Sequence, residues 1–325
     1  MDAGAGTRAR PCSTKTGASS EAVNNAVVAT SSLVLIGSFF WVPAGLWYFW
    51  RRKCTTRRRK ALFLAVLLAA MLAPVPTNRR VAKFFLWNRF LRYFSGKVVG
   101  ERGAATGRQA LFCLVPHGVF PFGVALASIG DLNQKYFHSL RPVVASAIAR
   151  APLIGQILSL IGAVSASPAA MDRALKQGHS LGLAPGGIAE MFLDGKAGSE
   201  FALVRKRKGF VRKAIANGVP IVPVFVFGNS ETFRRANLPS LLETASRLLQ
   251  ASLVLFWGRV GLPIPFKVPL TFAVGRPVEV GLTMNPSPSE AEVDRLHAAF
   301  CDALTETFER HKHACGWGHK TLELL

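Results

Sequence analysis

Acidic residues are scarce in this sequence, and their scarcity sets the charge of the whole chain. The 325 residues include 18 Asp and Glu against 40 Lys and Arg, which gives a formal net charge of +22 at pH 7. Such an excess predicts a polyanionic partner, which could be a nucleic acid, an anionic membrane surface or a phosphorylated substrate. Half of the residues are hydrophobic and the mean hydropathy is +0.28, a high value for a purely soluble enzyme.

The chain also lacks patterns that mark several other classes of protein. Its five cysteines, at positions 12, 54, 113, 301 and 315, have neither CxxC nor paired spacing, so we expect reduced thiols on the cytosolic side of a membrane. The first 25 residues contain no continuous apolar run, which argues against a cleaved secretory signal. No internal repeat is apparent. The length predicts one large or two smaller domains.

Two apolar stretches near the N-terminus flank a strongly basic one. Residues 26–50 contain no charged side chain. A helix over this segment would be long enough to cross a hydrocarbon core of about 30 Å. The apolar segment 61–76 is shorter and predicts a short span, a re-entrant segment or an interfacial helix. The sequence RRKCTTRRRK (51–60) separates them. We expect a membrane-embedded region over 26–76, kinked at Pro43; two buried core helices are the alternative.

The rest of the chain divides by composition. Residues 1–25 are polar and are expected to be disordered, residues 77–310 should form the catalytic domain, and residues 311–325 a solvated tail. Short apolar runs alternate with helical periods beyond about residue 105, which predicts an α/β fold with a mixed or mostly parallel sheet flanked by helices. The expected strands are 110–115, 180–184, 200–204, 219–228 and 270–275.

Two helices are predicted with defined ends. Residues 208–218 should form a helix that ends at Gly218 in a left-handed cap. The last helix should begin at a capping box from Ser287 to Glu290, with Pro288 at its first position. Its apolar residues then fall on one face: Val293, Leu296, Phe300, Leu304 and Phe308.

A single histidine follows the first of these strands, in QALFCLVPHGVFPFG (109–123). His117 stands between Pro116 and Gly118, at an edge where α/β folds place their chemistry. An imidazole with a pKa near 6.5 could act there as a general base on an alcohol, although a hydrogen-bonded structural role is the alternative. Cys113 cannot be its nucleophilic partner, because four extended residues separate the two by about 13 Å.

The sequence LAPGGIAEMF (183–192) contains a turn and a carboxylate. Pro185, Gly186 and Gly187 predict a tight turn that exposes backbone N–H groups to an anion. Glu190 follows in an otherwise apolar segment. It could orient a histidine or cap a turn, or it could be a helix-start residue bound by local N–H groups.

A second basic cluster, RKRKGFVRK, spans residues 205–213 and carries six positive charges. At the start of a helix it would bind phosphate, because side-chain charge and helix dipole reinforce each other. A solvated face or a contact with anionic lipid is the alternative. A nucleic-acid partner is not expected, because Phe210 is the only aromatic residue in the cluster and a stacking surface needs several.

In their order and spacing, these three stretches resemble the type 2 diacylglycerol acyltransferase family, which also includes monoacylglycerol and wax-alcohol acyltransferases. VPHG (115–118) is similar to the family's x-P-H-G block, and LAPGGIAEMF to its P-G-G-x-x-E block. RKGFVRKAIANGVPIVPVFVFG (207–228) is similar to its R-K-G-F helix and V-P-V strand. Weaker matches occur at FWGR (256–259) and VGRPVEV (274–280). The resemblance covers roughly residues 85–310 and the N-terminal apolar region.

This resemblance implies a glycerolipid-acyltransferase-like fold and an acyl-CoA-dependent O-acyltransferase that makes triacylglycerol from diacylglycerol. Monoacylglycerol, a fatty alcohol or a lysolipid are alternative acceptors. Acyl-CoA is a co-substrate, and no cofactor or metal is expected. The resemblance also implies a protein of the endoplasmic reticulum membrane, with its catalytic domain in the cytosol. It is compatible with an association with lipid droplets, and it favours the endoplasmic reticulum over the plastid envelope. A homo-oligomer is compatible with it. An inactive membrane protein that binds anionic lipid is the alternative from another class.

The resemblance assigns roles residue by residue. His117 becomes the base that takes the acceptor's hydroxyl proton, and the turn at Gly186 and Gly187 supplies N–H groups to the oxyanion. Glu190 would orient or polarise the histidine, or hold the acceptor. The remaining substrate-binding set contains two residues expected to meet the phosphates of coenzyme A, Arg207 and Lys208, and five neighbours of the motifs: Pro116, Gly118, Pro185, Gly209 and Phe210.

The sequence departs from related patterns in two places. Val115 stands where animal members of the family have another histidine, and Phe122 stands where the H-x4-D motif of other glycerolipid acyltransferases has its aspartate. Glu190 is therefore the remaining candidate to polarise His117. Near the C-terminus, RHKHACGWGHK (310–320) contains three histidines and a cysteine, but their spacing matches no defined zinc site, and a solvated tail is expected there.

Overall fold

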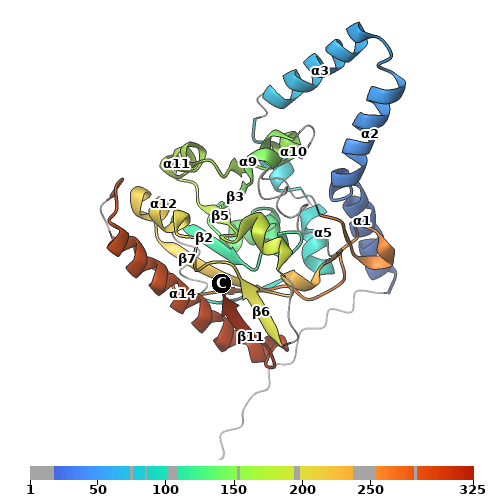
Figure 1. The fold of residues 1–325 in the computed structure, drawn as a ribbon. Helices are drawn as coiled ribbons and strands as arrows, with labels where there is room; N and C mark the ends of the chain where they lie inside the picture. Colours follow the sequence, from blue (N-terminus) through green and yellow to red (C-terminus); the bar gives the residue numbers. More distant parts are fainter. Residues whose placement is uncertain are drawn as a thin grey trace, which may run out of the picture.

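The computed structural model of the chain describes residues 18–73, 76–84, 86–101, 108–151, 154–193, 198–236, 254–281 and 284–325. Three N-terminal helices lie beside and above an α/β body (Figure 1). Residues 1–17 of the expected disordered N-terminus lie outside the described residues. Residues 18–25 are helical, because the first helix begins at Ala18 rather than after residue 25.

A seven-stranded mixed sheet forms the centre of the body, in the order β1-β10-β7-β2-β5-β3-β4. Neighbouring strands from β7 to β4 are parallel, β10 is antiparallel to β7, and β1 is parallel to β10. The predicted mixed α/β sheet is therefore confirmed. The strands are β1 (Lys97–Gly100), β2 (Leu111–Val115), β3 (Arg141–Val144), β4 (Val164–Ser165), β5 (Leu181–Leu183), β7 (Ile221–Phe227) and β10 (Thr271–Val274).

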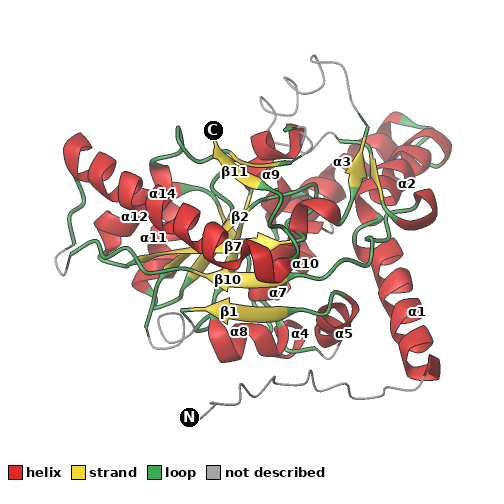
Figure 2. Cartoon of the chain, turned by 90° about the horizontal axis from the view of Figure 1, so that it is seen from below, coloured by secondary structure: helices red, strands yellow, loops and turns green. Residues whose placement is uncertain are grey.

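The central strands are buried on both faces, which explains their continuous apolar sequences. Every residue of β2 and β7 is buried. Alternate residues of β2 enter different cores: Cys113 packs with one cluster, and Phe112 and Leu114 with the other. The first cluster is covered by α11 (Pro168–Lys176), α12 (Gly209–Asn217) and α14 (Glu290–Lys312), and the second by α5 (Leu86–Tyr93), α7 (Phe122–Ala127) and α8 (Gly130–Tyr136). Figure 2 shows these helices on either side of the sheet.

Both predicted helices are present, but the last one begins later than expected. Helix α12 ends at Gly218, whose φ of 62° confirms the left-handed cap. The N-cap of α14 is Ser289 rather than Ser287, since the Ser289 hydroxyl accepts the backbone N–H of Glu292 at 3.2 Å. The capping pair is therefore Ser289 and Glu292 instead of Ser287 and Glu290, and Pro288 precedes the helix instead of occupying its first position. The predicted apolar face is buried throughout: Val293, Leu296, Phe300, Leu304 and Phe308.

The predicted strand 200–204 lies outside the central sheet. It forms β6 (Ser199–Ala202), which pairs in parallel with β11 (Thr321–Leu324) in a separate two-stranded sheet. The expected solvated tail is therefore wrong for these residues (Figure 1). The anchor is Trp317, which is buried against Phe225 and Phe227, with ring centroids 6.2 and 5.4 Å away. Within the described ranges, no three His, Cys, Asp or Glu side chains are placed to hold a metal ion.

The remaining elements are short. Strands β8 (Arg234–Arg235) and β9 (Phe256–Trp257) form an antiparallel pair. The short helices are α4 (Arg79–Ala82), α9 (Ser146–Arg150) and α10 (Ile154–Leu160), and the 3-10 turns are η1 (Gly187–Phe192), η2 (Asn229–Glu231), η3 (Arg259–Gly261) and η4 (His313–Cys315).

The apolar N-terminal region forms three helices, α1 (Ala18–Leu35), α2 (Ser38–Arg52) and α3 (Arg57–Leu72). No single helix of the described chain is long and apolar enough to cross a membrane, but α1 and α2, bent by 43° where they meet, satisfy the length and hydropathy requirements together. The bend lies at Gly37, whose N–H donates to the carbonyl of Ser32 at 2.9 Å, rather than at Pro43, which lies inside α2.

Helices α2 and α3 form a hairpin that stands away from the α/β body, with the basic sequence 51–60 at its tip (Figure 1). The ring of Phe63 stacks on Phe49 at 5.6 Å, which holds the two helices together. No described residue of α3 is buried. The alternative of two buried core helices is therefore wrong for α3.

Candidate active site

His117 lies directly after β2, at the carboxyl end of the central parallel strands, where sequence analysis placed it. The Val115–Pro116 peptide bond is cis, and Gly118 has a φ of +63°. A Cβ atom at position 118 would lie 2.9 Å from both the side-chain nitrogen and the carbonyl oxygen of Asn229. Glycine is therefore required beside the histidine for two reasons, its backbone conformation and its close contact with Asn229.

The imidazole of His117 is held by its own backbone neighbour. Its Nδ1 lies 2.7 Å from the carbonyl oxygen of Gly118. A carbonyl can only accept, so Nδ1 carries the proton and Nε2 keeps its lone pair in the neutral ring. Burial lowers the pKa of His117 below 6.5, although the bond to Gly118 opposes this effect. The ring is thus neutral at pH 7, with Nε2 available to accept a proton.

Glu190 lies next to His117 because β5, which leads into η1, is the neighbour of β2. Its Oε1 accepts the backbone N–H of His117 at 2.7 Å. The carboxyl group therefore anchors the backbone of the histidine. It does not contact the imidazole ring, which it was expected to polarise, because the ring nitrogen Nδ1 is bound to the carbonyl of Gly118. Oε2 is buried without a hydrogen-bond partner in the described structure.

Burial raises the pKa of Glu190 to about 7, although hydrogen bonds from the backbone of His117 and Leu203 oppose the shift. The side chain is only 5% exposed. Near neutral pH, Glu190 thus exchanges a proton while remaining hydrogen-bonded to the histidine backbone.

This shift predicts that Glu190→Gln reduces the pH dependence of stability. The native carboxyl binds its proton more tightly than an unfolded one with a pKa near 4.5, so wild-type stability falls as pH rises from about 4.5 through about 7, by on the order of 3 kcal/mol. Glutamine keeps an acceptor for His117 and does not titrate. Denaturant unfolding of both proteins at pH 5 and pH 8 tests this; parallel losses of stability in the two proteins would contradict it.

The turn before Glu190 leaves room for its carboxyl group. A Cβ atom at Gly186 would lie 1.8 Å from Oε2 of Glu190. Gly187 has a φ of +56° and its N–H donates to the carbonyl of Ala184 at 3.1 Å. Of the two N–H groups expected to bind an oxyanion, that of Gly187 is therefore occupied. No hydrogen bond within the described residues uses the N–H of Gly186, which leaves one donor. Pro185, before this turn, has no N–H to offer.

Asn229 is a site residue that sequence analysis missed. It follows β7, the other neighbour of β2, and its side chain is fully buried. Its Nδ2 donates to the carbonyl oxygens of Pro116 and His117 at 2.9 and 2.8 Å, and its Oδ1 accepts the N–H of Gly123 at 3.1 Å. The sequence did contain a signal for this residue. Asn229 closely follows an apolar strand, and that strand ends at the same edge of the sheet as the strand before His117.

Replacing Asn229 with alanine should therefore destabilise the protein by about 3 kcal/mol, because it leaves two carbonyls and one N–H unpaired in the interior. Asn229→Asp provides the matched comparison, since a carboxylate of the same size can accept from Gly123 but cannot donate to the two carbonyls. Both variants should unfold at lower denaturant concentration and lose acyl transfer. Wild-type stability in both would contradict this role for the amide.

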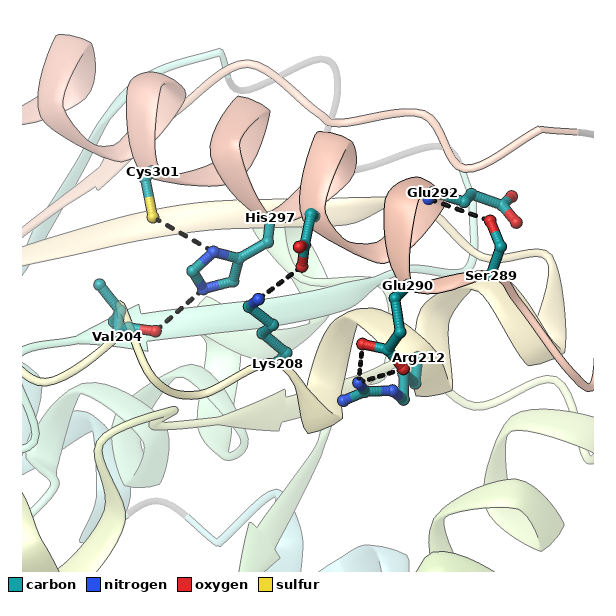
Figure 3. Close-up of polar contacts among 9 residues, drawn as sticks. Val204, Lys208, Arg212, Ser289, Glu290, Glu292, His297 and Cys301 are labelled. Atoms are coloured by element: carbon teal, nitrogen blue, oxygen red, sulfur yellow. Dashed lines mark hydrogen bonds and ion pairs between the residues drawn. The ribbon is translucent and has the colours of Figure 1, made fainter.

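The basic loop after β6 divides into paired and unpaired residues. Lys208 and Arg212 form ion pairs with α14, to Asp294 at 2.5 Å and to Glu290 at 2.6 Å (Figure 3). Lys213 pairs with Asp172 at 2.6 Å. Arg205, Lys206 and Arg207 form no ion pair with a carboxylate of the described chain. Of the two residues expected to meet phosphates, Lys208 is therefore already neutralised and Arg207 is not.

The last two predicted residues, Gly209 and Phe210, line the same cavity as His117. Gly209 begins α12, and a Cβ atom there would meet nothing within 4 Å. Phe210 is buried against Phe300, with ring centroids 4.9 Å apart, so it belongs to the core between α12 and α14.

These elements surround a cavity of about 1930 Å³. All six basic residues of the 205–213 cluster line it, and so do six other predicted site residues: His117, Pro185, Gly186, Gly187, Gly209 and Phe210. The rest of the lining is almost entirely apolar and comes from α2, α7, β3, α9, α11 and β9. A long apolar substrate that carries anionic groups fits such a cavity.

A neutral histidine at a sheet edge, lining a cavity with an apolar wall and a basic wall, defines an α/β enzyme that acts on lipid-like substrates. The family model described as Diacylglycerol acyltransferase matches residues 61–324. The chain belongs to this family and is an acyltransferase. The match begins within α3 and includes β11, and so extends at its C-terminal end beyond the region that carried the resemblance.

Similar proteins act on different acceptors. The chain is 30% identical to human 2-acylglycerol O-acyltransferase 3 over 71% of its length and 72% of that protein. It is 29% identical to bovine Diacylglycerol O-acyltransferase 2-like protein 6 (71% and 74%) and 28% identical to mouse acyl-CoA wax alcohol acyltransferase 1 (71% and 75%). A crystal structure of the 1-acyl-sn-glycerophosphate acyltransferase of Thermotoga maritima gives a TM-score of 0.45 at 12% identity, covering 89% of this chain and 97% of that one.

Proposed function

We propose that this acyltransferase moves a fatty acyl group from acyl-CoA to the free hydroxyl of diacylglycerol, forming triacylglycerol, with His117 as general base. The observation that carries the proposal is the state of the imidazole. Nδ1 is engaged by the carbonyl of Gly118 and the ring is neutral, which leaves Nε2 as a base at the wall of an apolar cavity.

The reaction needs one proton transfer in each direction. Nε2 of His117 takes the hydroxyl proton as the acceptor oxygen attacks the thioester carbonyl. The N–H of Gly186 is the candidate donor to the tetrahedral oxyanion. Collapse of this intermediate breaks the carbon–sulfur bond, and the coenzyme A thiolate recovers the proton from the imidazolium. Glu190 and Asn229 hold the histidine backbone in place throughout and touch no reacting atom.

The unpaired cations Arg205, Lys206 and Arg207 would bind the phosphates of coenzyme A. All three line the cavity and lack a carboxylate partner in the described chain, so an incoming phosphate need not displace an existing ion pair. Lys208 could contribute only by leaving Asp294.

Membrane attachment through the N-terminal hairpin belongs to the same proposal. Helices α2 and α3 expose large apolar side chains, among them Trp47 and Leu72, which are 64% and 73% exposed. The basic tip between them suits an anionic lipid surface. We place the enzyme in the endoplasmic reticulum membrane with its catalytic body in the cytosol, where it could also reach lipid droplets.

The test is a transfer assay with membranes from cells that lack their own neutral-lipid acyltransferases. Labelled acyl-CoA is supplied with diacylglycerol, monoacylglycerol, fatty alcohol or lysophosphatidate, and wild type is compared with His117→Ala. Label in triacylglycerol that requires His117 would support the reaction and the base. Preference for monoacylglycerol or fatty alcohol would change the acceptor and keep the mechanism. Equal transfer by both proteins would overturn the role of His117.

A further inference from the structure

The cavity has two halves of different chemistry, which lie on opposite faces of the sheet. Met171, Leu183 and Phe210 belong to the core beneath α11, α12 and α14, and the basic residues of the cavity lie on this side. Phe256 and Val124 belong to the other core, against which Phe40 packs. No charged residue lines the cavity on the second side, within the described part of the chain. His117 follows β2, the strand that separates the two cores.

We propose that the aromatic half is the acceptor-lipid subsite, and that α2 completes it through Phe39 and Phe40. This inference rests on the proposed function and adds the place where the acceptor binds. The N-terminal helix pair would then be part of the active site as well as an attachment to the membrane.

The aromatic wall is built from segments that are distant in sequence. The ring of Phe40 lies 5.1 Å from that of Phe256, which in turn lies 5.1 Å from Phe233. Phe39 and Phe40 are partly buried and line the cavity. Without α2, the α/β body would lack one side of this wall.

Charge separates the two substrates. Acyl-CoA carries phosphates, so it is drawn to the half that contains Arg205, Lys206 and Arg207. An acceptor without phosphate gains nothing there, while the aromatic half can bury its acyl chains without leaving a charge unpaired. The hydroxyl and the thioester would therefore approach His117 from opposite faces of the sheet.

The route of entry follows from α2. The same helix that lines the cavity with Phe40 exposes Trp41, Trp47 and Tyr48 on its outer surface, where they are 49%, 64% and 57% exposed. A neutral lipid dissolved in a membrane would pass from this outer surface to the aromatic half along one helix, without crossing the basic half of the cavity.

The test compares Phe40→Ala with Phe84→Ala, the same substitution at a ring that is 46% exposed, lies outside α2 and α3 and does not line the cavity. Phe40→Ala should raise KM for the acceptor about tenfold and leave KM for acyl-CoA unchanged, because one apolar ring contact with the acceptor is lost. Phe84→Ala should change neither value. An unchanged acceptor KM in Phe40→Ala, or an equal rise in both KM values, would overturn the proposal. Recovery of each variant in the membrane fraction is measured in parallel.

A second measurement does not depend on turnover. A diacylglycerol that carries a diazirine in one acyl chain is photolysed with full-length His117→Ala protein, and the labelled peptides are mapped by mass spectrometry. Labelling at residues 39–40 and 254–256 supports the subsite even if no transfer is observed. Labelling confined to the half beneath α11 and α12 would overturn it while leaving the proposed reaction in place.

Discussion

His117→Ala is expected to lower kcat for acyl transfer by about 10³-fold, the range lost when a positioned general base is removed. The loss should fall mainly on chemistry, because alanine removes only the bond from Nδ1 to Gly118 and keeps the two hydrogen bonds made by the backbone of position 117. Its N–H donates to Glu190 and its carbonyl accepts from Asn229, and alanine keeps both groups. The variant should therefore unfold close to the wild-type denaturant concentration and remain in the membrane fraction. Single-turnover transfer of labelled acyl groups at saturating substrate measures the change.

The pH profile separates a base from a structural histidine. Burial lowers the pKa of His117, so its neutral form persists below pH 6.5, and loss of activity from its protonation begins only at lower pH. The residual activity of His117→Ala should lack this acidic limb. His117→Gln keeps a polar side chain without a comparable base and should be as inactive as the alanine variant. Wild-type activity in the glutamine variant would exclude a proton transfer at this position.

Gly186→Ala should be the most damaging single-methyl change at the site, lowering kcat/KM by about 10²-fold, the penalty of displacing a reacting group by about 1 Å. Its Cβ would lie 1.8 Å from Oε2 of Glu190 and 2.9 Å from the Cβ of the same residue. The carboxyl group must then leave its place, and the 2.7 Å bond to the N–H of His117 is lost. Steady-state kinetics with acyl-CoA and diacylglycerol provide the measurement.

Gly187→Ala is the matched control for this prediction. At Gly187 a Cβ would meet nothing within 4 Å, but the residue has a φ of +56°. Alanine there should cost about 1–2 kcal/mol of folding stability, the penalty of a left-handed conformation, with activity close to wild type. If the two variants lost activity equally, strain in the turn would explain the loss, and the contact between Gly186 and Glu190 would not.

The sequence predicted the central strands because they are long and uniformly apolar. Strands β2 and β7 lie where FCLV and IVPVFVF predict them, since a strand buried on both faces needs no alternation. Strands β1, β3 and β4 were missed. They have two to four residues each, and β3 contains a proline, so their pairing depends on neighbours brought by the fold rather than on a local pattern.

The candidate site could be predicted in part, because some of its residues lie in local sequence motifs. His117, Gly186 and Glu190 belong to short motifs, and the adjacency of β2 and β5 brings them together. The atoms in contact could not be predicted, because they depend on backbone orientation. Glu190 was expected to reach the imidazole and instead binds the backbone N–H of His117. Lys208 was expected to be free for phosphate, but α14, some 80 residues later in the chain, brings Asp294 to it.

Pairing of β6 with β11 determines when the enzyme becomes complete during its synthesis. Strand β6 leads directly into the basic loop, and the N–H of Arg205 donates to the carbonyl of Leu325 at 2.7 Å. On the ribosome, the hairpin of α2 and α3 emerges long before residue 321 is translated. The loop that would bind coenzyme A gains these contacts with β11 and Leu325 only when the C-terminal residues emerge. With the membrane attachment proposed above, the nascent chain would reach its lipid surface before it could use acyl-CoA.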